Sequence, residues 1–329
     1  MTERSTETTL LDFEPDVDTF YDDVIDGLSR PSPSLPCKYF YDAIGSKLFD
    51  EICGLEEYYL TRTELAIMEQ HASEMAEQIG PSVMLVEYGS GSSTKTRILL
   101  DHLTAPVAYV PVDISRVHLQ DSANGLAELY PKTEVLPVCA DFTQKFNLPL
   151  SSEPPTHNAV YFPGSTIGNF MPDAAREMLA RIVDLCGCGG GLLIGVDLQK
   201  DADIIEAAYN DSSGVTAKFN LNLLDRINRE LDGDIRVDQF RHRAKYNQQL
   251  GRVEIDLVSQ CHQAITIGSH LFNFAKDEAI RTEYSHKYTI EGFGKLASTV
   301  GLTLRRHWTD EHNRFAVLHL AIQERNDDR

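Results

Sequence analysis

The chain has 329 residues, 42% of them hydrophobic, so it is long enough to bury one large core or two smaller ones. Its formal net charge at pH 7 is −20, with acidic residues spread along the sequence, which disfavours a nucleic-acid partner and favours a small cationic or zwitterionic ligand. The longest apolar runs are too short for a membrane span, and the first residues do not resemble a signal peptide. We therefore expect a cytoplasmic, monomeric protein that acts on a small molecule, with no membrane partner.

The cysteines are scattered, and only Cys186 and Cys188 lie close together. Their segment, "LCGCGGG", lacks the spacing and the partner pair of a metal site, so we expect two small side chains packed at a helix end and no bound metal. A chain of this length does not need disulfides for stability.

Two helices are predicted ahead of the first strand. Apolar residues in 16–30 recur on one helical face. Thr61 and Glu64 match a capping box, which predicts a second helix that begins there and ends near Gly80.

From Val83 onward the sequence alternates between apolar strands and helices. The strands are "VMLVEY", "VAYVPVDI", "TEVLPVC", "AVYFPGST" and "GLLIGVDL", and helices are expected from Ser93, Ser115 and Pro172. Such alternation predicts a parallel sheet covered by helices on both faces. The fold class is therefore a doubly wound α/β domain.

The alternation ends after Leu198. Two helices are predicted around the turn at residues 212–214, followed by antiparallel strands in "GRVEIDLVSQCHQAITIG" and "HLFNFAKDEAIRTEYSHKYT". After Thr289 a helix and a hairpin are expected to return to the parallel sheet, so the α+β unit is an insertion. The expected domains are 16–199 plus 289–329, and a smaller domain of 200–288 together with 1–15.

A glycine loop, "EYGSGSSTKT", follows the first of these strands. A P-loop and a dinucleotide-binding loop both require glycine where Thr94 stands, so phosphate and pyrophosphate ligands are disfavoured. Acids at three successive strand ends, Glu87, Asp113 and Asp141, are the arrangement that class I methyltransferases use for S-adenosylmethionine (SAM). Asp113 would bind the ribose hydroxyls, and Asp141 with Phe142 the adenine. An alternative stays open at this point: Asp113 and Asp141 are only helix caps or solvated loop acids.

Longer motifs extend this interpretation. The segments "KYFYDAIGSKLFDEICGLEEYYLTRTE", "VEYGSGSSTKTRILL", "FPGSTIGNF", "YNDSSGVTAKFN" and "RTEYSHKY" resemble the histidine Nα-methyltransferases of ergothioneine biosynthesis. The resemblance covers the chain from about Lys38 to its end. It implies a class I SAM methyltransferase with a Rossmann-like sheet and an inserted α+β substrate domain.

The resemblance also implies a set of site residues. The implied SAM-binding residues are Tyr41, Gly89, Lys95, Asp113, Asp141 and Phe142. Asn169 and Tyr209 would hold the substrate carboxylate, with Gly164 and Tyr58 near the amine, and the implied catalytic residues are Tyr41, Tyr58 and Asn169. Read without the resemblance, Lys95 is equally a solvated helix residue, Asn169 a turn or cap residue, and Tyr58 and Tyr209 core aromatics.

The substrate side chain is assigned to one strand. Glu283 and Ser285 are two residues apart, so both would face one imidazole ring, although a solvated strand face is the plain alternative. Ile255 stands where family members often have methionine. Because this position lies beside the ring, the alternative substrate is another aromatic amino acid, such as tryptophan or tyrosine.

The expected reaction is in-line methyl transfer from SAM to the α-amine of L-histidine, in three rounds that give hercynine. A sulfonium cation nearby would favour the uncharged amine, and the faces of Tyr41, Tyr58 and Tyr59 would suit the quaternary ammonium product. Two other classes remain: a nicotinamide-dependent dehydrogenase and a ligand-binding protein without turnover. Titration with NAD and with S-adenosylhomocysteine would identify the dehydrogenase, whereas donor binding with no turnover on any amine would identify the ligand-binding protein.

Overall fold

The computed structural model describes residues 8–13, 19–91 and 94–322. The chain divides into two compact units. In its described parts, unit 1 comprises residues 8–13, 63–91, 94–198 and 288–322, and unit 2 comprises residues 19–62 and 199–287. Each unit is built around its own sheet.

Unit 1 contains one large sheet with the strand order β1-β5-β3-β2-β6-β7-β14-β13, and β4 pairs with β3. The strands from β1 to β7 run parallel, whereas β14 is antiparallel to both β7 and β13. Their bounds are β1 Leu11–Asp12, β2 Val83–Tyr88, β3 Ala108–Asp113, β4 Glu134–Val135, β5 Val138–Cys139, β6 His157–Phe162, β7 Gly191–Asp197, β13 Leu302–Thr309 and β14 Phe315–Ile322. The doubly wound sheet and the returning hairpin predicted from the sequence are thus confirmed.

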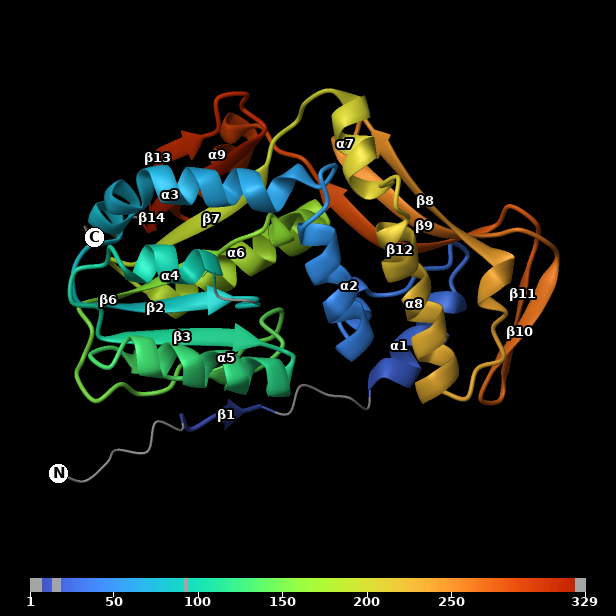
Figure 1. Ribbon diagram of the computed structural model, residues 1–329, viewed down its shortest axis with the longest axis horizontal. Helices are drawn as coiled ribbons and strands as arrows, with labels where there is room; N and C mark the ends of the chain where they lie inside the picture. Colours follow the sequence, from blue (N-terminus) through green and yellow to red (C-terminus); the bar gives the residue numbers. More distant parts are fainter. Residues whose placement is uncertain (1–7, 14–18, 92–93, 323–329) are drawn as a thin grey trace, which may run out of the picture. The chain divides into compact units, whose positions relative to one another are not determined.

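The helices of this part of the chain precede or connect the strands of the large sheet. They are α3 Tyr59–Ile79, α4 Thr94–Leu100, α5 Arg116–Leu129, the 3-10 helix η2 Thr166–Asn169, α6 Pro172–Cys186 and α9 Ile290–Ser298. Figure 1 shows β2 beside β3, with α5 packed along β3. Strands β2 and β7 are buried at every position, because helices on both faces of a parallel sheet exclude water from it.

Two of the four predicted helix starts are not confirmed. Helix α3 begins at Tyr59 rather than after Thr61, so the predicted capping box is wrong: Glu64 lies inside the helix and is fully buried. The predicted start of the next helix, Ser93, lies outside the described residues, and α4 is described from Thr94. The starts predicted at Ser115 and Pro172 agree with α5 and α6, for which Ser115 is the residue before the first turn and Pro172 the first helical residue.

Unit 2 combines helices with a three-stranded antiparallel sheet of order β12-β9-β8 and a separate hairpin, β10-β11. The strands are β8 Phe240–Asn247, β9 Arg252–Ser259, β10 Gln263–Ile267, β11 His270–Phe274 and β12 Ala279–His286. The helices are α1 Thr19–Leu28, η1 Cys37–Phe40, α2 Ala43–Cys53, α7 Ala202–Tyr209, α8 Val215–Glu230 and η3 Val237–Gln239. The two helices predicted around residues 212–214 are confirmed, whereas α2 and β8 were not predicted.

Strand β12 contains a register shift that decides which side chains share a face. Arg281 pairs with Asp256, but Glu283 pairs with Ile255, so Thr282 is the extra residue of a β-bulge. Directly opposed residues of an antiparallel pair lie on one face of the sheet. Arg281 and Glu283 therefore point to opposite faces although they are only two residues apart.

The N-terminal segments belong to different units from those expected. We expected 1–15 with the substrate domain and 16–62 with the methyltransferase domain, but the division into units has them the other way round. The reason is local pairing. Strand β1 extends the large sheet by pairing with β5, with Leu11 opposite Val138, and helix α2 packs against α8.

No helix among the described residues is long and apolar enough to cross a bilayer. The same residues contain no group of three or more His, Cys, Asp or Glu side chains that could hold a metal ion. Cys186 is the last residue of α6 and is buried, as expected, whereas Cys188 lies beyond the helix and is exposed, so the expectation that both side chains are packed is wrong for Cys188.

Candidate active site

In unit 1 the glycine loop is anchored by Glu87, the fifth residue of β2. Its carboxylate accepts hydrogen bonds from the Thr96 hydroxyl at 2.5 Å and from the Tyr109 hydroxyl at 2.5 Å. Burial raises the pKa of Glu87 to about 7, against the opposing effect of these two hydrogen bonds. Glu87 thus ties the start of α4 to β2 and β3.

The loop itself depends on two glycines with positive φ. Gly89 has φ +70° and Gly91 has φ +42°, backbone conformations that residues with a side chain rarely adopt. The Gly89 N–H donates a hydrogen bond to the Val112 carbonyl at 2.9 Å. The Gly91 N–H donates a hydrogen bond to the Asp113 carboxylate. The loop therefore curls over the end of β3, next to Asp113.

Asp113 lies at the carboxyl end of β3 and is partly buried. Burial raises the pKa of its carboxyl, although the backbone N–H groups of Ser115 and Gly91 act in the opposite direction. The Ser115 N–H donates to Asp113 Oδ1 at 2.9 Å. This side chain therefore does cap the turn into α5.

Asp141 and Phe142 follow β5. Asp141 Oδ1 accepts from the Thr143 N–H at 2.9 Å and from its hydroxyl at 2.6 Å, which holds the carboxylate in a tight turn. The Phe142 ring stacks on Tyr88 with centroids 5.3 Å apart and an interplanar angle of 10°. An aromatic surface and a carboxylate thus lie together at the same sheet edge as Asp113.

Lys95 is fixed by a buried carboxylate. Its Nζ lies 2.5 Å from Glu64 Oε2, and the Glu64 side chain is 0% exposed. The Gly164 N–H donates to both Glu64 oxygens, at 3.0 and 3.1 Å. A Cβ at Gly195 would lie 2.2 Å from Glu64 Oε1, so the absence of a side chain there makes room for this carboxylate. Glu64 therefore holds the first turn of α4 and the loop after β6 together.

Asn169 ends the short helix η2. Ser165, at the start of this helix, adopts φ +59° and accepts a hydrogen bond from the Asp197 N–H at 2.8 Å through its hydroxyl. The Asn169 side chain is partly exposed and forms no hydrogen bond with any residue that the structure describes. Its amide is therefore a fixed polar group with donors to offer to a ligand.

In unit 2 an aromatic cluster surrounds Tyr41 and Tyr58. The ring of Tyr41 meets Phe49 and Phe219 edge-on, with centroids 5.5 and 5.7 Å apart. The ring of Tyr58 meets Phe49 at 6.4 Å and Tyr209 at 6.2 Å. Burial raises the pKa of Tyr58 well above its usual value, so its hydroxyl stays protonated.

Tyr59 does not contribute a free ring face. The Nζ of Lys200 lies 4.6 Å from the centre of its ring and 2.6 Å from its hydroxyl oxygen. A cation of the protein itself therefore already lies against the Tyr59 ring, as a cation–π contact.

Three polar groups meet at the ends of α7 and β12. The Tyr209 hydroxyl and Ser285 Oγ are 2.8 Å apart, and Lys287 Nζ donates to Tyr209 at 2.7 Å and to Ser285 at 2.8 Å. All three residues are buried, with Lys287 only 2% exposed. Tyr209 is held from behind by His242, whose Nε2 lies 2.8 Å from the Tyr209 carbonyl oxygen.

Glu283 lies on the same face of the sheet as Ser285. Its carboxylate is partly buried and forms no hydrogen bond with any residue in the described part of the chain. Burial raises the pKa of Glu283 to about 7, and the Lys287 cation lowers it in part. Ile255 is directly opposite Glu283 in the β9–β12 pair and is buried. The Glu283 carboxylate, the Ser285 hydroxyl and the Ile255 side chain thus lie on the same face of the sheet.

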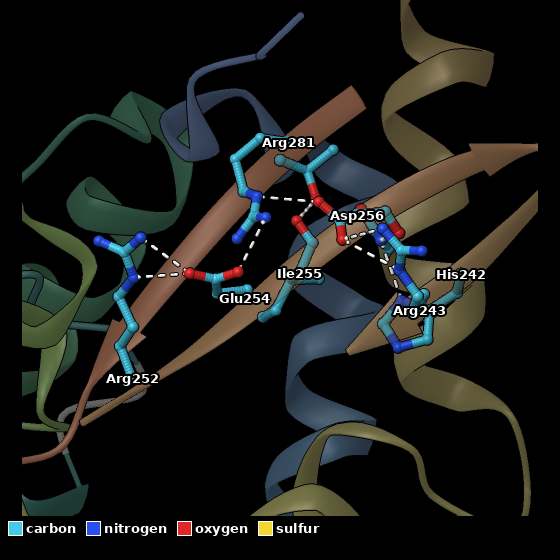
Figure 2. Close-up of polar contacts among 9 residues, drawn as sticks. His242, Arg243, Arg252, Glu254, Ile255, Asp256 and Arg281 are labelled. Atoms are coloured by element: carbon cyan, nitrogen blue, oxygen red, sulfur yellow. Dashed lines mark hydrogen bonds and ion pairs between the residues drawn. The ribbon is translucent and has the colours of Figure 1, made fainter. Parts of the chain in front are cut away.

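The other face of this sheet carries a ladder of ion pairs, shown in Figure 2. Asp256 pairs with Arg243 at 2.8 Å and with Arg281 at 2.8 Å, and Glu254 pairs with Arg252 at 2.8 Å and with Arg281 at 3.3 Å. These contacts link β8, β9 and β12, and so hold the strands in the register that places Glu283 opposite Ile255.

Comparison with known proteins assigns the chain to a family. Residues 20–322 match the family described as "Histidine-specific methyltransferase, SAM-dependent". The chain belongs to this family of SAM-dependent methyltransferases. The resemblance found in the sequence, the class I fold and the SAM ligand are thereby confirmed, and the dehydrogenase alternative is not supported.

Individual relatives cover almost the whole chain. The histidine N-alpha-methyltransferase of Mycobacterium tuberculosis is 38% identical over 301 residues, covering 90% of this chain and 92% of that protein. The enzyme of the same name from Mycolicibacterium smegmatis is 38% identical over 307 residues, covering 92% and 94%. The L-tryptophan methyltransferase of Psilocybe serbica is 28% identical over 330 residues, covering 90% and 91%.

The residues present in unit 1 fit a SAM methyltransferase. The Asp113 carboxylate beside the glycine loop and the aromatic surface of Phe142 are suited to a nucleoside, and the curled loop leaves room for close backbone approach. One edge of the sheet carries four of the expected residues, Gly89, Asp113, Asp141 and Phe142. Lys95 forms an ion pair with Glu64.

Two residues of the site were missed in the sequence. Glu64 was assigned to a helix cap, and no local signal reveals its contacts with Lys95 and Gly164, because these lie 31 and 100 positions away. Lys287 had a signal: it continues the two-residue spacing of Glu283 and Ser285, so it could have been placed on the same face.

Proposed function

We propose that this protein methylates the α-amino group of L-histidine with SAM, three times, to give hercynine. The observation that carries the proposal is the Glu283 carboxylate, which has no hydrogen-bond partner in the described chain and lies opposite Ile255 and beside the Ser285 hydroxyl. An imidazole ring offers an apolar face and two nitrogens two bonds apart, which suits a carboxylate and a hydroxyl on one strand. The two mycobacterial relatives, at 38% identity, support the same substrate.

Within this proposal, unit 1 binds the methyl donor through Gly89, Lys95, Asp113, Asp141 and Phe142, and Tyr41 adds an aromatic contact. Bound SAM supplies an electrophilic methyl group on a sulfonium. Asp113 is suited to hold the ribose hydroxyls, since hydrogen bonds from a diol to a carboxylate are charge-assisted. Asp141 and Phe142 offer an acceptor and a ring face to adenine.

The substrate's polar groups are assigned to three side chains and one backbone segment. Asn169 and Tyr209 are proposed as donors to the carboxylate, Tyr58 as a neutral hydroxyl near the amine, and Gly164 as part of the lining there. The protein's contribution to the reaction is mainly to orient the amine and to exclude water, because in-line transfer requires a positioned lone pair rather than a strong base. A dry surrounding also favours the uncharged amine.

Tyr41 and Tyr58 are proposed to accommodate the methyl groups as they accumulate. Their rings belong to one cluster with Phe49, and a ring face attracts a quaternary ammonium by roughly 0.5–2 kcal/mol. We also propose that unit 2 is the substrate-binding domain, and that the protein is a cytoplasmic monomer.

A second candidate substrate is another aromatic amino acid, such as tryptophan or tyrosine. It is favoured by Ile255, a branched side chain opposite Glu283 where methionine is common in the family, and by the similarity to an L-tryptophan methyltransferase. Branching at Cβ changes the shape of the pocket next to the ring with little change in volume.

One experiment decides between the two substrates. Protein saturated with S-adenosylhomocysteine is titrated by calorimetry with histidine, tryptophan and tyrosine, and turnover is followed with labelled SAM. Histidine is expected to bind and react best, with a product that carries three added methyl groups. No heat with S-adenosylhomocysteine, or turnover of tryptophan in preference to histidine, would contradict the proposal.

Replacing Glu283 with alanine is expected to raise the KM for histidine by about 10- to 100-fold, since a hydrogen bond to a charged group contributes about 1.5–3 kcal/mol. The KM for SAM should change less than twofold. Glu283 lies in unit 2, whereas the carboxylates proposed to bind SAM, Asp113 and Asp141, lie in unit 1. Steady-state kinetics with each substrate varied in turn measures both values. Glu278→Ala, which removes a carboxylate from the residue just before β12, is the matched control.

A further inference from the structure

Side chains at the end of α7 fill the outer edge of β8. The amide of Asn210, the residue after α7, donates to the Ala244 carbonyl at 3.0 Å and accepts from the Ala244 N–H at 3.3 Å, as the backbone of a neighbouring strand would. Glu206 Oε1 accepts from the Tyr246 N–H at 2.9 Å. Because β8 is the end strand of its sheet, these backbone groups face away from β9. The end of α7 is thus fixed to β8.

His242, on the same strand, adds a contact with the backbone of Tyr209. Tyr209 is the last residue of α7, and the carbonyls in the last turn of a helix have no donor within the helix. His242 Nε2 lies 2.8 Å from the Tyr209 carbonyl oxygen. A carbonyl oxygen only accepts hydrogen bonds, so the ring holds this carbonyl only when the hydrogen is on Nε2.

The other nitrogen of the His242 ring is controlled by Asn220 on α8. Asn220 Nδ2 lies 2.9 Å from His242 Nδ1 and donates to the Asp256 carbonyl at 3.1 Å. Exchanging the nitrogen and oxygen of this amide would bring two oxygens together at Asp256, so the nitrogen must face both partners. An NH2 group has one hydrogen for each of them. His242 Nδ1 is therefore an acceptor and carries no hydrogen.

The His242 ring is also held in its neutral form. Burial lowers the pKa of His242, whereas the contact with the Tyr209 backbone and the carboxylates of Asp211 and Asp256 act in the opposite direction. A second hydrogen, on Nδ1, would point at the NH2 group of Asn220, which is itself a donor. The Asn220 amide and the Tyr209 carbonyl thus select one form of the ring, the neutral tautomer with its hydrogen on Nε2.

We propose that His242 is a positioning residue for substrate binding: held by Asn220 as the Nε2–H tautomer, it fixes the backbone of Tyr209 and, with it, the hydroxyl assigned to the substrate carboxylate. This inference rests on the proposed function. The Tyr209 hydroxyl lies 2.8 Å from Ser285 Oγ, so a shift at the end of α7 displaces one group of the proposed substrate site relative to another.

Nuclear magnetic resonance reads the tautomer directly. Protein labelled with nitrogen-15 in its histidine rings is saturated with S-adenosylhomocysteine at pH 7.5, and the spectrum of His242→Gln identifies the His242 signals by their loss. We expect a protonated Nε2 and a bare Nδ1 in the wild type. A ring with its hydrogen on Nδ1, or with a hydrogen on both nitrogens, would overturn the inference whichever amino acid the protein methylates.

Two substitutions at His242 separate the contact with Tyr209 from packing. A glutamine amide nitrogen reaches the position of Nε2 and can donate to the Tyr209 carbonyl, whereas an asparagine amide reaches only the position of Nδ1. We expect His242→Asn to raise the KM for histidine about 10-fold and to leave the KM for SAM within about twofold, and His242→Gln to keep both within about threefold of the wild type. His262→Asn, at an exposed position of the same unit, is the control and should behave as the wild type.

A wild-type KM for histidine in His242→Asn would overturn the positioning role, as would a His242→Gln variant that is impaired as much as His242→Asn. In either case a wild type that methylates histidine leaves the proposed function intact, so this inference fails alone. A wild type that does not methylate histidine defeats the proposed function and this role of His242 with it. Should His242→Asn not fold, the wild-type spectrum still decides whether Asn220 and the Tyr209 carbonyl select the tautomer.

Discussion

Replacing Lys95 with methionine is expected to lower the free energy of unfolding by about 3–5 kcal/mol, because the change leaves a buried carboxylate without its cation. Glu64 is fully buried, and its remaining partner is the Gly164 N–H. A backbone donor satisfies one lone pair but does not neutralise the charge. Urea denaturation of the wild type and the variant, with equal m-values, measures the difference.

The double variant Glu64→Gln/Lys95→Met shows whether the pair is the cause. Once the carboxylate is removed, no buried charge remains, so the double variant should be more stable than Lys95→Met alone. Lys145→Met, at an exposed position of the same unit, is the control and should lie within about 0.5 kcal/mol of the wild type. A Lys95→Met variant as stable as this control would show that Glu64 is paired by other means.

Replacing Asn169 with alanine is expected to lower kcat/KM for histidine by about 10²–10³-fold. The amide has no partner among the described residues and is held at the end of η2, so its proposed role is to orient the substrate carboxylate. Loss of a hydrogen bond to a charged group accounts for about 1.5–3 kcal/mol, and a misplaced amine adds to it, since small displacements of a nucleophile are costly in rate.

Binding of S-adenosylhomocysteine separates this role from a structural one. The Asn169→Ala variant should bind S-adenosylhomocysteine with an affinity within about threefold of the wild type, because loss of a donor to the amino acid does not alter the nucleoside contacts. Asn147→Ala, an exposed residue of the same unit, should behave as the wild type in both assays. Full activity in Asn169→Ala would exclude the proposed contact.

The sheet of unit 1 was predictable because its strands are continuous apolar runs bounded by glycine and acidic residues. A strand buried on both faces cannot tolerate charge, so "VMLVEY" and "GLLIGVDL" stand out from the helices between them. The strand order was not predictable in the same way. The position of β14 beside β7 depends on pairing between residues more than 100 positions apart, such as Leu318 and Ile194.

Unit 2 was less predictable because its strands are half exposed and rich in charge. Strand β8, "FRHRAKYN", looks like a basic segment, yet Arg243 is there to pair with Asp256 on the neighbouring strand. The proposed substrate-site residues Tyr58, Tyr209, Glu283 and Ser285 were named from family resemblance rather than from local pattern. The contacts of Tyr209 and Ser285 with Lys287 emerge only when α7 and β12 are seen together.

The bulge at Thr282 separates two kinds of chemistry along one strand. Arg281 before it belongs to the ion-pair ladder, and Glu283 after it faces Ile255. Variants designed to change the preference for one amino acid substrate over another can therefore alter residues 283–287 separately from residues 279–281. Deleting Thr282 would restore regular alternation with Arg281 still opposite Asp256 and Glu283 still opposite Ile255, so both side chains would keep their present faces and only the local distortion of the strand would be lost.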